Sequence, residues 1–559
     1  MRSFLPVVLV ALAAACSRPS QPAGPLAMSD LPNISTEAIL ADTRKLSSDE
    51  FEGRAPGTKG EELTVQYFIE QFKAAGLQPG NPDGSWTQKV PLVSLTPQPQ
   101  GPVVVKRGGQ TRPFKIRDEI VVFSKHVTDE VRLENSELVF AGYGVQAPEF
   151  QWDDFRGVDV KGKTIVVLVN DPPVAAIGNP NELDPKIFGG KAMTYYGRWT
   201  YKFEKAAELG AAGVLIVHET VPAGYPFTVV QGMGGERFDL VTPDKNAGRA
   251  KIEGWMSVEA ATALLKMAGQ DYQKLKAQAA TREFRAIPLG ATASVTVKQK
   301  IRTLDSQNVM AKLPGSDPVL KDEYIVYTAH WDHFGVGEPV NGDNIYNGAL
   351  DNASGCAMVL EIGRQMAKLK PQPKRSILFL MVTAEEQGLL GSQYYAEFPL
   401  YPLQKTLANI NIDGINQWGR TKDLTLIGLG ASDLDDYARA AADEQGRVLR
   451  PDAEPEKGFY YRSDHFNFAK KGVPALDPDS GIEFLGKPAD YGKKKRDEYT
   501  SVDYHAPSDQ VKPDWDLSGA AEDGRLFLAV GYRLAQADRF PEWKPGNEFK
   551  AIRDKMLGR

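Results

Sequence analysis

The sequence predicts an α/β protein whose main domain is a mainly parallel, helix-covered central sheet, with a smaller β-rich domain inserted into it. A chain of 559 residues exceeds what one hydrophobic core usually supports. From Ser306 onward, short apolar strands alternate with helical segments, as in a parallel sheet covered on both faces. Between about residues 137 and 288, several strands surround a helical stretch at residues 203–209, which indicates a second unit.

The first 16 residues are predicted to be an export signal. Arg2 precedes an apolar stretch from Phe4 to Ala15, which is too short to span a bilayer stably. The run ending at Cys16 resembles a bacterial lipoprotein cleavage site, although Ala13 stands where such sites usually have Leu. We expect an exported protein, periplasmic or anchored to the outer membrane through a lipid on Cys16. A plain signal peptide cut near Ala15 is the alternative, and would give a secreted protein.

The segments that follow are predicted in order. Residues 17–30 form a flexible tether, because residues 17–25 are rich in Ser, Pro, Gln and Gly. Residues 31–130 form the first segment of the main domain, where a helical pattern begins after Ser35 and ends at Gly76. Residues 131–292 form the inserted domain, and residues 293–559 form the second segment of the main domain.

Charge and cysteine content narrow the function classes. The net charge of -6 is spread along the chain without basic runs, so a nucleic-acid partner is not expected. With Cys16 lipidated, Cys356 would be the remaining cysteine, and the mature chain could hold no internal disulfide. Cys356 is interpreted as a small buried apolar residue. A membrane contact is expected only through the N-terminal lipid.

Three predicted strands in the last part of the chain each lead to acidic or imidazole side chains. Strand 324–328 leads to His330, strand 377–382 to Glu385 and Glu386, and strand 408–412 to Asp413. In open α/β sheets, ligands bind just beyond the carboxyl ends of the strands. These side chains should therefore converge at one edge of the sheet.

Two more candidates come from loops. Asp351 lies in the glycine-bearing loop 347–355, and His505 lies near the end of a chain with only six histidines. Two imidazoles and three carboxylates suit two metal ions that share one bridging carboxylate and leave open positions for water. The charges also balance, because three carboxylates and one hydroxide offset two divalent cations.

The order and flanks of these residues resemble the co-catalytic zinc exopeptidases, which include leucyl aminopeptidases, aminopeptidase Y and glutamate carboxypeptidase II. The motifs that carry the resemblance are Ala329-His-Trp-Asp-His, Asp351-Asn-Ala-Ser-Gly and Ala384-Glu-Glu, together with Glu52-Gly-Arg-Ala-Pro-Gly and Arg462-Ser-Asp-His-Phe. Residues 141–144 and 205–214 are similar to the protease-associated (PA) domain that some members insert.

The resemblance implies a zinc-exopeptidase, phosphorylase/hydrolase-like fold, peptide substrates and two Zn²⁺ per chain, with Co²⁺ or Mn²⁺ as alternatives. His330 and Glu386 would bind one ion, Asp413 and His505 the other, and Asp351 both. The oligomeric state is left open.

Several roles follow from the same resemblance. Glu385 would be the general base that acts on a hydroxide held between the two zinc ions, and Tyr504 would stabilise the oxyanion. Asp332 would orient His330, and Asp509 would do so for His505. Arg462 would bind the substrate or pair with an acid such as Asp464.

The remaining histidines and the N-terminal motif have plainer interpretations. His333 and His465 are expected to be structural or supporting groups, and His126 and His218 to have no special role. The turn at residues 52–57 is expected to support the site rather than to contact substrate.

The expected activity is that of an aminopeptidase, a dizinc metallopeptidase acting on peptide N-termini. A carboxypeptidase or dipeptidase using the same metals is the nearest alternative, and a cluster of arginines beside the metals would favour it. A glutaminyl cyclase, a receptor-like binding protein without catalysis and a lipid-anchored scaffold that presents the inserted domain are further alternatives.

Overall fold

The structure is a computed structural model that describes residues 26–176, 178–232 and 234–559. The predicted signal, residues 1–16, and most of the predicted tether lie outside these residues. The end of the tether is described and differs from the expectation. Met28–Asp30 form a short 3₁₀ helix, and the Met28 N–H donates to Glu444 Oε2 at 2.7 Å. These residues are therefore held against the main unit.

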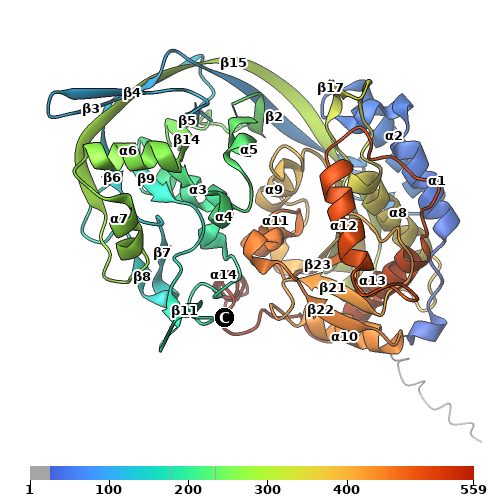
Figure 1. The fold of residues 1–559 in the computed structure, drawn as a ribbon. Coiled ribbons are helices and arrows are strands. Elements are labelled where there is room, and N and C mark those ends of the chain that lie inside the picture. Colours follow the sequence, from blue (N-terminus) through green and yellow to red (C-terminus); the bar gives the residue numbers. More distant parts are fainter. Residues whose placement is uncertain (1–25, 177, 233) are drawn as a thin grey trace, which may run out of the picture.

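The molecule has two lobes (Figure 1). The larger lobe contains four parallel neighbouring strands in the order β19, β16, β20 and β23. Their bounds are Ser376–Val382, Tyr324–His330, Thr406–Asn411 and Ala475–Asp479. β21 (Asp423–Ile427) pairs antiparallel to β23, and β22 (Val448–Pro451) pairs in parallel with β21. The prediction of an α/β fold with a mainly parallel central sheet is confirmed.

Helices cover both faces of this sheet, so β16, β19 and β20 are buried along their whole length. Alternate residues of β16 point to opposite faces. Ile325 and Tyr327 belong to the core under α1 (Thr36–Leu46), α2 (Lys59–Ala74), α8 (Gly355–Met366), α10 (Leu434–Glu444) and α13 (Ser518–Gln536). Tyr324 and Val326 belong to the opposite core, with α9 (Leu390–Glu397) and α11 (His465–Lys470).

The predicted helical segment between Ser35 and Gly76 is helical, but it consists of two helices rather than one. Ser35 caps α1, because its Oγ accepts the Ala38 N–H at 3.1 Å. The pattern then breaks into two helices, because a turn at Asp49–Arg54 separates α1 from α2. This turn contains the start of the Glu52-Gly-Arg-Ala-Pro-Gly motif. The periodicity of apolar residues alone does not reveal this break between the two helices.

The smaller lobe contains the parallel strands β6 (Glu130–Phe140), β9 (Thr164–Leu168), β12 (Gly213–His218) and β14 (Ile252–Ser257). Its β5 (Ile120–Phe123) pairs antiparallel to β14, and β3 (Val103–Arg107) and β4 (Gln110–Phe114) form a hairpin. Val103 and Phe114 lie in one core with Val166 and Leu215. This core therefore begins earlier in the chain than the expected boundary at residue 131.

The smaller lobe also holds more helix than its sequence pattern led us to expect. In addition to α3 (Trp199–Glu208), two helices, α6 (Val258–Met267) and α7 (Tyr272–Ala279), pack on its sheet. A periodic signal was present, since Ala261, Leu264 and Leu265 are spaced to face one side of α6.

Two long strands join the lobes (Figure 1). β15 (Ile287–Leu313) pairs antiparallel with β2 (Thr87–Pro99), from Val297 opposite Pro99 to Val309 opposite Thr87. The expected boundary at residues 292–293 falls inside β15. The two lobes are thus connected through a continuous hydrogen-bonded ribbon rather than through a flexible linker at this point.

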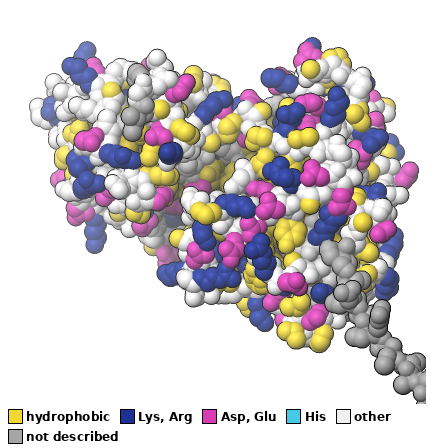
Figure 2. Space-filling model, turned by 90° about the horizontal axis from the view of Figure 1, so that it is seen from below, with side chains coloured by type: hydrophobic (Ala, Val, Ile, Leu, Met, Phe, Trp, Pro, Cys, Tyr) yellow, Lys and Arg dark blue, Asp and Glu magenta, His cyan; other side chains and the backbone are white. Residues whose placement is uncertain are grey.

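The surface is hollowed between the two lobes on the face seen in Figure 2, and charges of both signs are interspersed over it. Within the described parts of the chain, no helix has the length and apolar content needed to cross a bilayer.

The contact of α13 with β16 yields a stability prediction. Tyr327 Oη donates to the Phe527 carbonyl at 2.7 Å. A Cβ added at Gly531 would lie 1.9 Å from the Tyr327 hydroxyl oxygen. Gly531→Ala should therefore destabilise the fold by about 1–3 kcal/mol. This cost exceeds the gain of about 1 kcal/mol in helix propensity. Denaturant unfolding measures the difference.

The same substitution in a Tyr327→Phe background provides the control. Without the hydroxyl, the added methyl group meets less resistance, so Gly531→Ala should cost less there. An equal cost in both backgrounds would contradict the proposed clash.

Candidate metal centre

Strand register brings the first candidate ligands to one edge of the sheet. Thr328 of β16 pairs with Asn411 of β20, so Asp413 follows beside His330. His330 also pairs with Val382 of β19, and Glu386 follows in the loop beyond that strand. The expected convergence at the carboxyl ends of the strands is therefore present.

All five candidate ligands meet at this edge. His330 Nε2 lies 3.2 Å from Asp351 Oδ1 and 3.2 Å from Asp413 Oδ1. His505 Nε2 lies 3.3 Å from Asp351 Oδ2 and 3.2 Å from Glu386 Oε2. Asp351 thus faces both imidazoles, with a different oxygen toward each.

These contacts exchange the partners expected from the family resemblance. That interpretation placed His330 with Glu386, and His505 with Asp413. In the structure His330 contacts Asp413, while His505 contacts Glu386. The reason is the register: Asp413 lies beside His330 on the neighbouring strand, whereas the Glu386 side chain extends from the next loop toward the His505 loop.

The donor set fits metal ions. Two ligand atoms at about 2.0–2.1 Å from one tetrahedral Zn²⁺ lie roughly 3.3 Å from each other. The four imidazole–carboxylate distances, 3.2–3.3 Å, match this spacing. The ligand atoms of His330, Asp351 and Glu386 also all lie within 4.8 Å of one another. Imidazole and carboxylate are the ligands that zinc sites of enzymes use.

Glu385 lies at the edge of this cluster. Its Oε2 is 3.9 Å from His330 Nε2, which is further than the oxygens of Asp351 and Asp413. Burial raises the pKa of the Glu385 carboxyl well above its ordinary value. The Glu385 carboxyl group therefore lies beside the cluster, but Asp351 and Asp413 are closer to His330 Nε2.

Asp332 has a different contact from the one expected. His330 Nδ1 lies 3.2 Å from the backbone carbonyl of Asp332, and 3.8 Å from its carboxylate. The carboxylate instead accepts the backbone N–H groups of Glu385 and Glu386, at 2.9 and 3.3 Å. Asp332 therefore holds the Glu385–Glu386 turn through its side chain and contacts His330 through its main chain.

Asp509 likewise supports a different residue from the one expected. Its carboxylate accepts the backbone N–H groups of Leu350 and Asp351 at 3.0 Å. Burial raises the pKa of the Asp509 carboxyl to about 6. Asp509 thus fixes the loop that presents Asp351, and the expectation that it orients His505 is wrong.

The Arg54 side chain explains the Glu52-Gly-Arg-Ala-Pro-Gly motif. Its buried guanidinium donates to four backbone carbonyls, three of which lie close in sequence to the candidate ligands His330 and Asp351. The acceptors are Leu46, Trp331, Asn347 and Gly348, at 2.6–2.8 Å. The expectation that this turn supports the site is confirmed.

Two further residues hold the carboxylates in place. His333 Nδ1 lies 2.6 Å from Glu386 Oε1, so that carboxylate faces an imidazole with each oxygen. Ser463 Oγ donates to Asp413 Oδ2 at 2.6 Å. Ser463 was not predicted, although it belongs to the Arg462-Ser-Asp-His-Phe motif. His465 is buried, and burial lowers its pKa to about 3, as suits a neutral structural group.

Tyr504 and Arg462 flank the cluster. The Tyr504 ring stacks on His505, with centroids 3.7 Å apart, and its side chain is exposed. Arg462 forms no ion pair with any described residue. Asp464, which was an expected partner, instead accepts a hydrogen bond from Ser392 Oγ at 2.5 Å. The Arg462 guanidinium lies 5.4 Å from the Phe459 ring.

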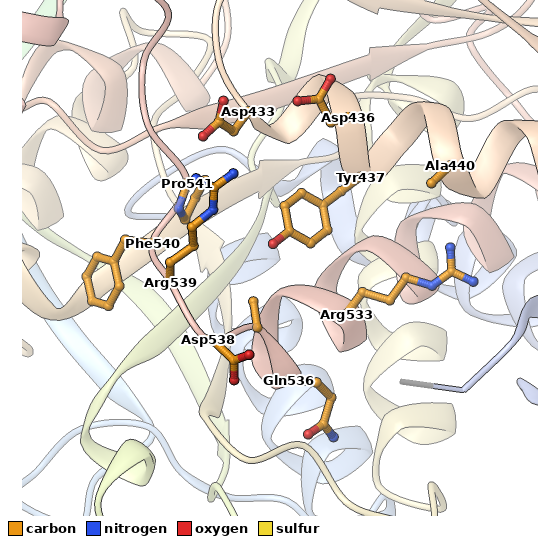
Figure 3. A pocket seen from close by; sticks show the side chains of 11 residues that line it. Asp433, Asp436, Tyr437, Ala440, Arg533, Gln536, Asp538, Arg539, Phe540 and Pro541 are labelled. Carbon is orange, nitrogen blue, oxygen red and sulfur yellow. The ribbon is translucent and has the colours of Figure 1, made fainter. Parts of the chain in front are cut away.

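A separate surface hollow of about 490 Å³ lies between α10 and the end of α13 (Figure 3). None of the candidate ligands lines it. Two of its charged groups have partners in the protein, since Asp433 pairs with Lys544 at 2.7 Å and Arg533 with Glu444 at 2.7 Å. This hollow is not part of the candidate metal centre.

The segment that carries the metal ligands matches a known protein family. Residues 308–529 match the model of peptidase family M28. The expected resemblance to zinc peptidases is confirmed over this segment, which contains all five candidate ligands. The match is consistent with the predicted metallopeptidase class.

Individual relatives match over shorter stretches. Aminopeptidase NAALADL1 of Mus musculus is 35% identical over 133 residues, which are 23% of this chain and 16% of that protein. A "Probable zinc metalloprotease" of Pyrenophora tritici-repentis (strain Pt-1C-BFP) is 40% identical over 104 residues, 18% of this chain and 20% of that protein. The match thus spans at most about a fifth of these relatives' length.

Among solved structures, the aminopeptidase from Aneurinibacillus sp. strain AM-1 is similar at 21% identity, with a TM-score of 0.45. The match covers 92% of this chain and 95% of that one.

The two imidazoles make metal binding sensitive to pH. Burial would lower the pKa of His505, but the contacts with Asp351 and Glu386 raise it to about 10. Burial also opposes protonation of His330, yet Asp413 and Glu385 raise its pKa well above the ordinary value. The neighbouring carboxylates thus favour the protonated form of both imidazoles in the absence of metal, and metal binding must displace these protons.

Zinc affinity should consequently weaken by roughly tenfold for each displaced proton when the pH falls by one unit. Competition with a chromophoric chelator between about pH 6 and pH 8 measures this dependence. An affinity that stays constant over this range would show that the imidazoles do not bind the metal.

Proposed function

We propose that the chain is a zinc-dependent aminopeptidase that removes residues from the N-termini of peptides at a pair of zinc ions. The observation that carries this proposal is the position of Asp351, whose two carboxylate oxygens face His330 and His505 separately. One carboxylate between two such imidazoles is the arrangement that a bridging ligand requires. The family match over residues 308–529 supports the peptidase class.

In this proposal, one zinc ion is held by His330, Asp413 and Asp351. The other is held by His505, Glu386 and Asp351. Bound zinc would act as a Lewis acid toward the scissile carbonyl and would lower the pKa of a water molecule on the metal. Cobalt or manganese could replace zinc with the same ligand types.

Glu385 is assigned as the general base. Its carboxylate lies beside the ligand cluster, and the Asp332 carboxylate fixes its backbone N–H. It would take a proton from the attacking water and deliver that proton to the leaving amine. Tyr504, stacked on His505, is assigned to stabilise the oxyanion through its hydroxyl.

A carboxypeptidase or dipeptidase remains the second candidate. The observation that favours it is Arg462, which lies next to Ser463 and has no carboxylate partner among the described residues. A receptor-like protein without catalysis is less well supported, because the five ligand side chains and Glu385 meet in one place.

The finer assignments outside the catalytic lobe also belong to this proposal. The smaller lobe is proposed to be a PA-like domain, on the basis of the sequence motifs at residues 141–144 and 205–214. The chain is proposed to be exported and anchored by a lipid on Cys16, which lies in the part of the chain outside the described residues.

Glu385→Gln tests the role of the base. The amide keeps the shape of the side chain but cannot accept the proton, so turnover should fall by roughly 100-fold or more while zinc content stays unchanged. Steady-state kinetics on an unblocked peptide and metal analysis of the same preparation provide the two measurements.

Glu397→Gln is the matched control, because Glu397 is exposed on α9. It should leave both turnover and zinc content unchanged. Loss of zinc in Glu385→Gln would show that the roles of Glu385 and Glu386 are reversed.

Alanine substitutions test the exchanged ligand pairs. Asp351→Ala should weaken both zinc sites together, because this carboxylate faces both imidazoles. Asp413→Ala and His330→Ala should each weaken the same single site. Zinc titration followed by metal analysis distinguishes these patterns, and loss of one ion only in Asp351→Ala would contradict the bridge.

A further inference from the structure

The turn between β19 and α9, which carries Glu385, has an unfavourable backbone conformation at two positions. Ala384, directly before Glu385, has a φ of 52°, and Leu389 has a φ of 61°. Both angles lie in the left-handed region, which residues with a side chain rarely adopt. Such a conformation persists only where the surrounding structure holds it. The position of Glu385 therefore depends on the contacts that hold this turn.

The side chain of Asn308 in β15 joins the two ends of the turn. Its Oδ1 accepts the Thr383 N–H at 3.1 Å, and its Nδ2 donates to the Gly391 carbonyl at 2.9 Å. The amide is fully buried, so water does not compete for these groups. A Cβ added at Gly391 would lie 2.6 Å from Asn308 Oδ1, which shows how closely the amide fits. One side chain thus links the residues just before and just after 384–390.

Other side chains of the same strands support this link. Asn308 Nδ2 also donates to Gln88 Oε1 of β2 at 3.1 Å. Ser306 Oγ of β15 donates to Glu61 Oε1 at 3.0 Å and lies 2.6 Å from Thr383 Oγ1. β2 and β15 form the ribbon that joins the two lobes (Figure 1). The turn of Glu385 is therefore held from the ribbon as well as from the parallel sheet.

The stretch of chain that forms the smaller lobe adds an apolar contact. β13 (Arg237–Leu240) comes from this stretch and pairs antiparallel with β2, so that Leu240 lies opposite Leu92. Leu240 belongs to one buried apolar cluster with Leu92, Ala384 and Leu390. The inserted stretch thus contributes to the core beneath the turn.

Glu385 depends on its backbone more than Glu386 does. The Glu386 carboxylate faces His333 at 2.6 Å and His505 at 3.2 Å. Within the described ranges, the Glu385 carboxylate has no hydrogen-bonding side chain of its own, and its Oε2 lies 3.9 Å from His330 Nε2. A shift of the turn would therefore displace Glu385 more freely than it would displace Glu386.

We propose that Asn308 is a positioning residue for Glu385, and that Leu240 of the inserted stretch supports the same turn. The inference rests on the proposed peptidase function and adds to it a role for the ribbon between the lobes. A displacement of about 1 Å at a catalytic group can lower turnover by roughly 100-fold. Because the amide does not contact the ligand cluster, the loss should appear in kcat rather than in KM or in zinc content.

Asn308→Asp tests the proposal. The aspartate keeps an acceptor for the Thr383 N–H but cannot donate to the Gly391 carbonyl. The kcat of the zinc-loaded protein on an unblocked peptide should fall by about 10- to 100-fold, while KM changes by less than about twofold. Metal analysis should find the zinc content of the wild type.

Asn246→Asp is the matched control in the smaller lobe. Asn246 is also buried, its Nδ2 donates to the Lys125 carbonyl at 3.1 Å, and its Oδ1 accepts from Thr242 Oγ1. Both variants should unfold at a lower temperature than the wild type, because each loses one buried hydrogen bond. Only Asn308→Asp should lose turnover. An unchanged kcat in Asn308→Asp, or an equal fall in both variants, would overturn the proposal, and loss of zinc would assign the link to Glu386 instead.

Leu240→Ala tests the contribution of the inserted stretch, and carries the test of the turn if Asn308→Asp does not fold. Leu264→Ala is its control, because Leu264 is a buried leucine of α6 in the core of the smaller lobe. Both variants should unfold several degrees below the wild type. Leu240→Ala alone should show a lower kcat with an unchanged KM. Equal kcat values in the two variants would exclude the role of Leu240.

If the wild-type protein cleaves no peptide, the proposed function fails, and hydrogen exchange then tests the link separately. The backbone amides of residues 384–390 should exchange faster in Asn308→Asp than in the wild type, because the turn has lost a contact that holds it. The same amides should be unaffected in Asn246→Asp. Exchange at the wild-type rate in Asn308→Asp would show that the amide does not hold the turn.

Discussion

The candidate metal centre of the larger lobe depends on one carboxylate, that of Asp351, placed between two imidazoles. Its oxygens lie 3.2 Å from His330 Nε2 and 3.3 Å from His505 Nε2. Three carboxylates gathered in a buried space repel one another, so such a cluster is stable only when positive charge is present. The carboxylates favour protonation of the imidazoles, which would provide that charge in the absence of metal, and divalent cations would provide it when bound. Most other features of the lobe hold this carboxylate and its neighbours in position.

That support comes largely from hydrogen bonds between side chains and the backbone. Arg54 binds carbonyls on both sides of the site, Asp509 fixes the loop of Asp351, and Asp332 fixes the turn of Glu385. Each is a buried charged group whose partners are main-chain atoms. Because the loops themselves have no regular secondary structure to set their shape, these contacts determine where the ligands lie. Ser463 and His333 extend the same support to the carboxylates of Asp413 and Glu386.

Charged side chains are paired differently in the surface hollow of the larger lobe and at the junction of the lobes. The hollow between α10 and α13 contains charged residues that pair within the protein. At the junction of the lobes, Arg198 and Arg462 remain without acceptors for their Nε atoms among the described residues. The ribbon of β2 and β15 joins the smaller lobe to the larger one through continuous antiparallel pairing.

The sequence by itself predicted the fold class and which side chains gather in one place, the five candidate ligands and Glu385. His330, Glu386 and Asp413 follow from apolar strands that lead to acids or imidazoles, because parallel strands share a carboxyl edge. Asp351 and His505 lie in loops, and the family resemblance completed the set. Only the tertiary structure decided which ligands are neighbours, because the register of β16 against β20 places Asp413 beside His330. It also decided that Asp509 supports Asp351 rather than His505. Such contacts join residues far apart in the chain, and their geometry depends on strand register and loop shape, which local sequence patterns do not encode.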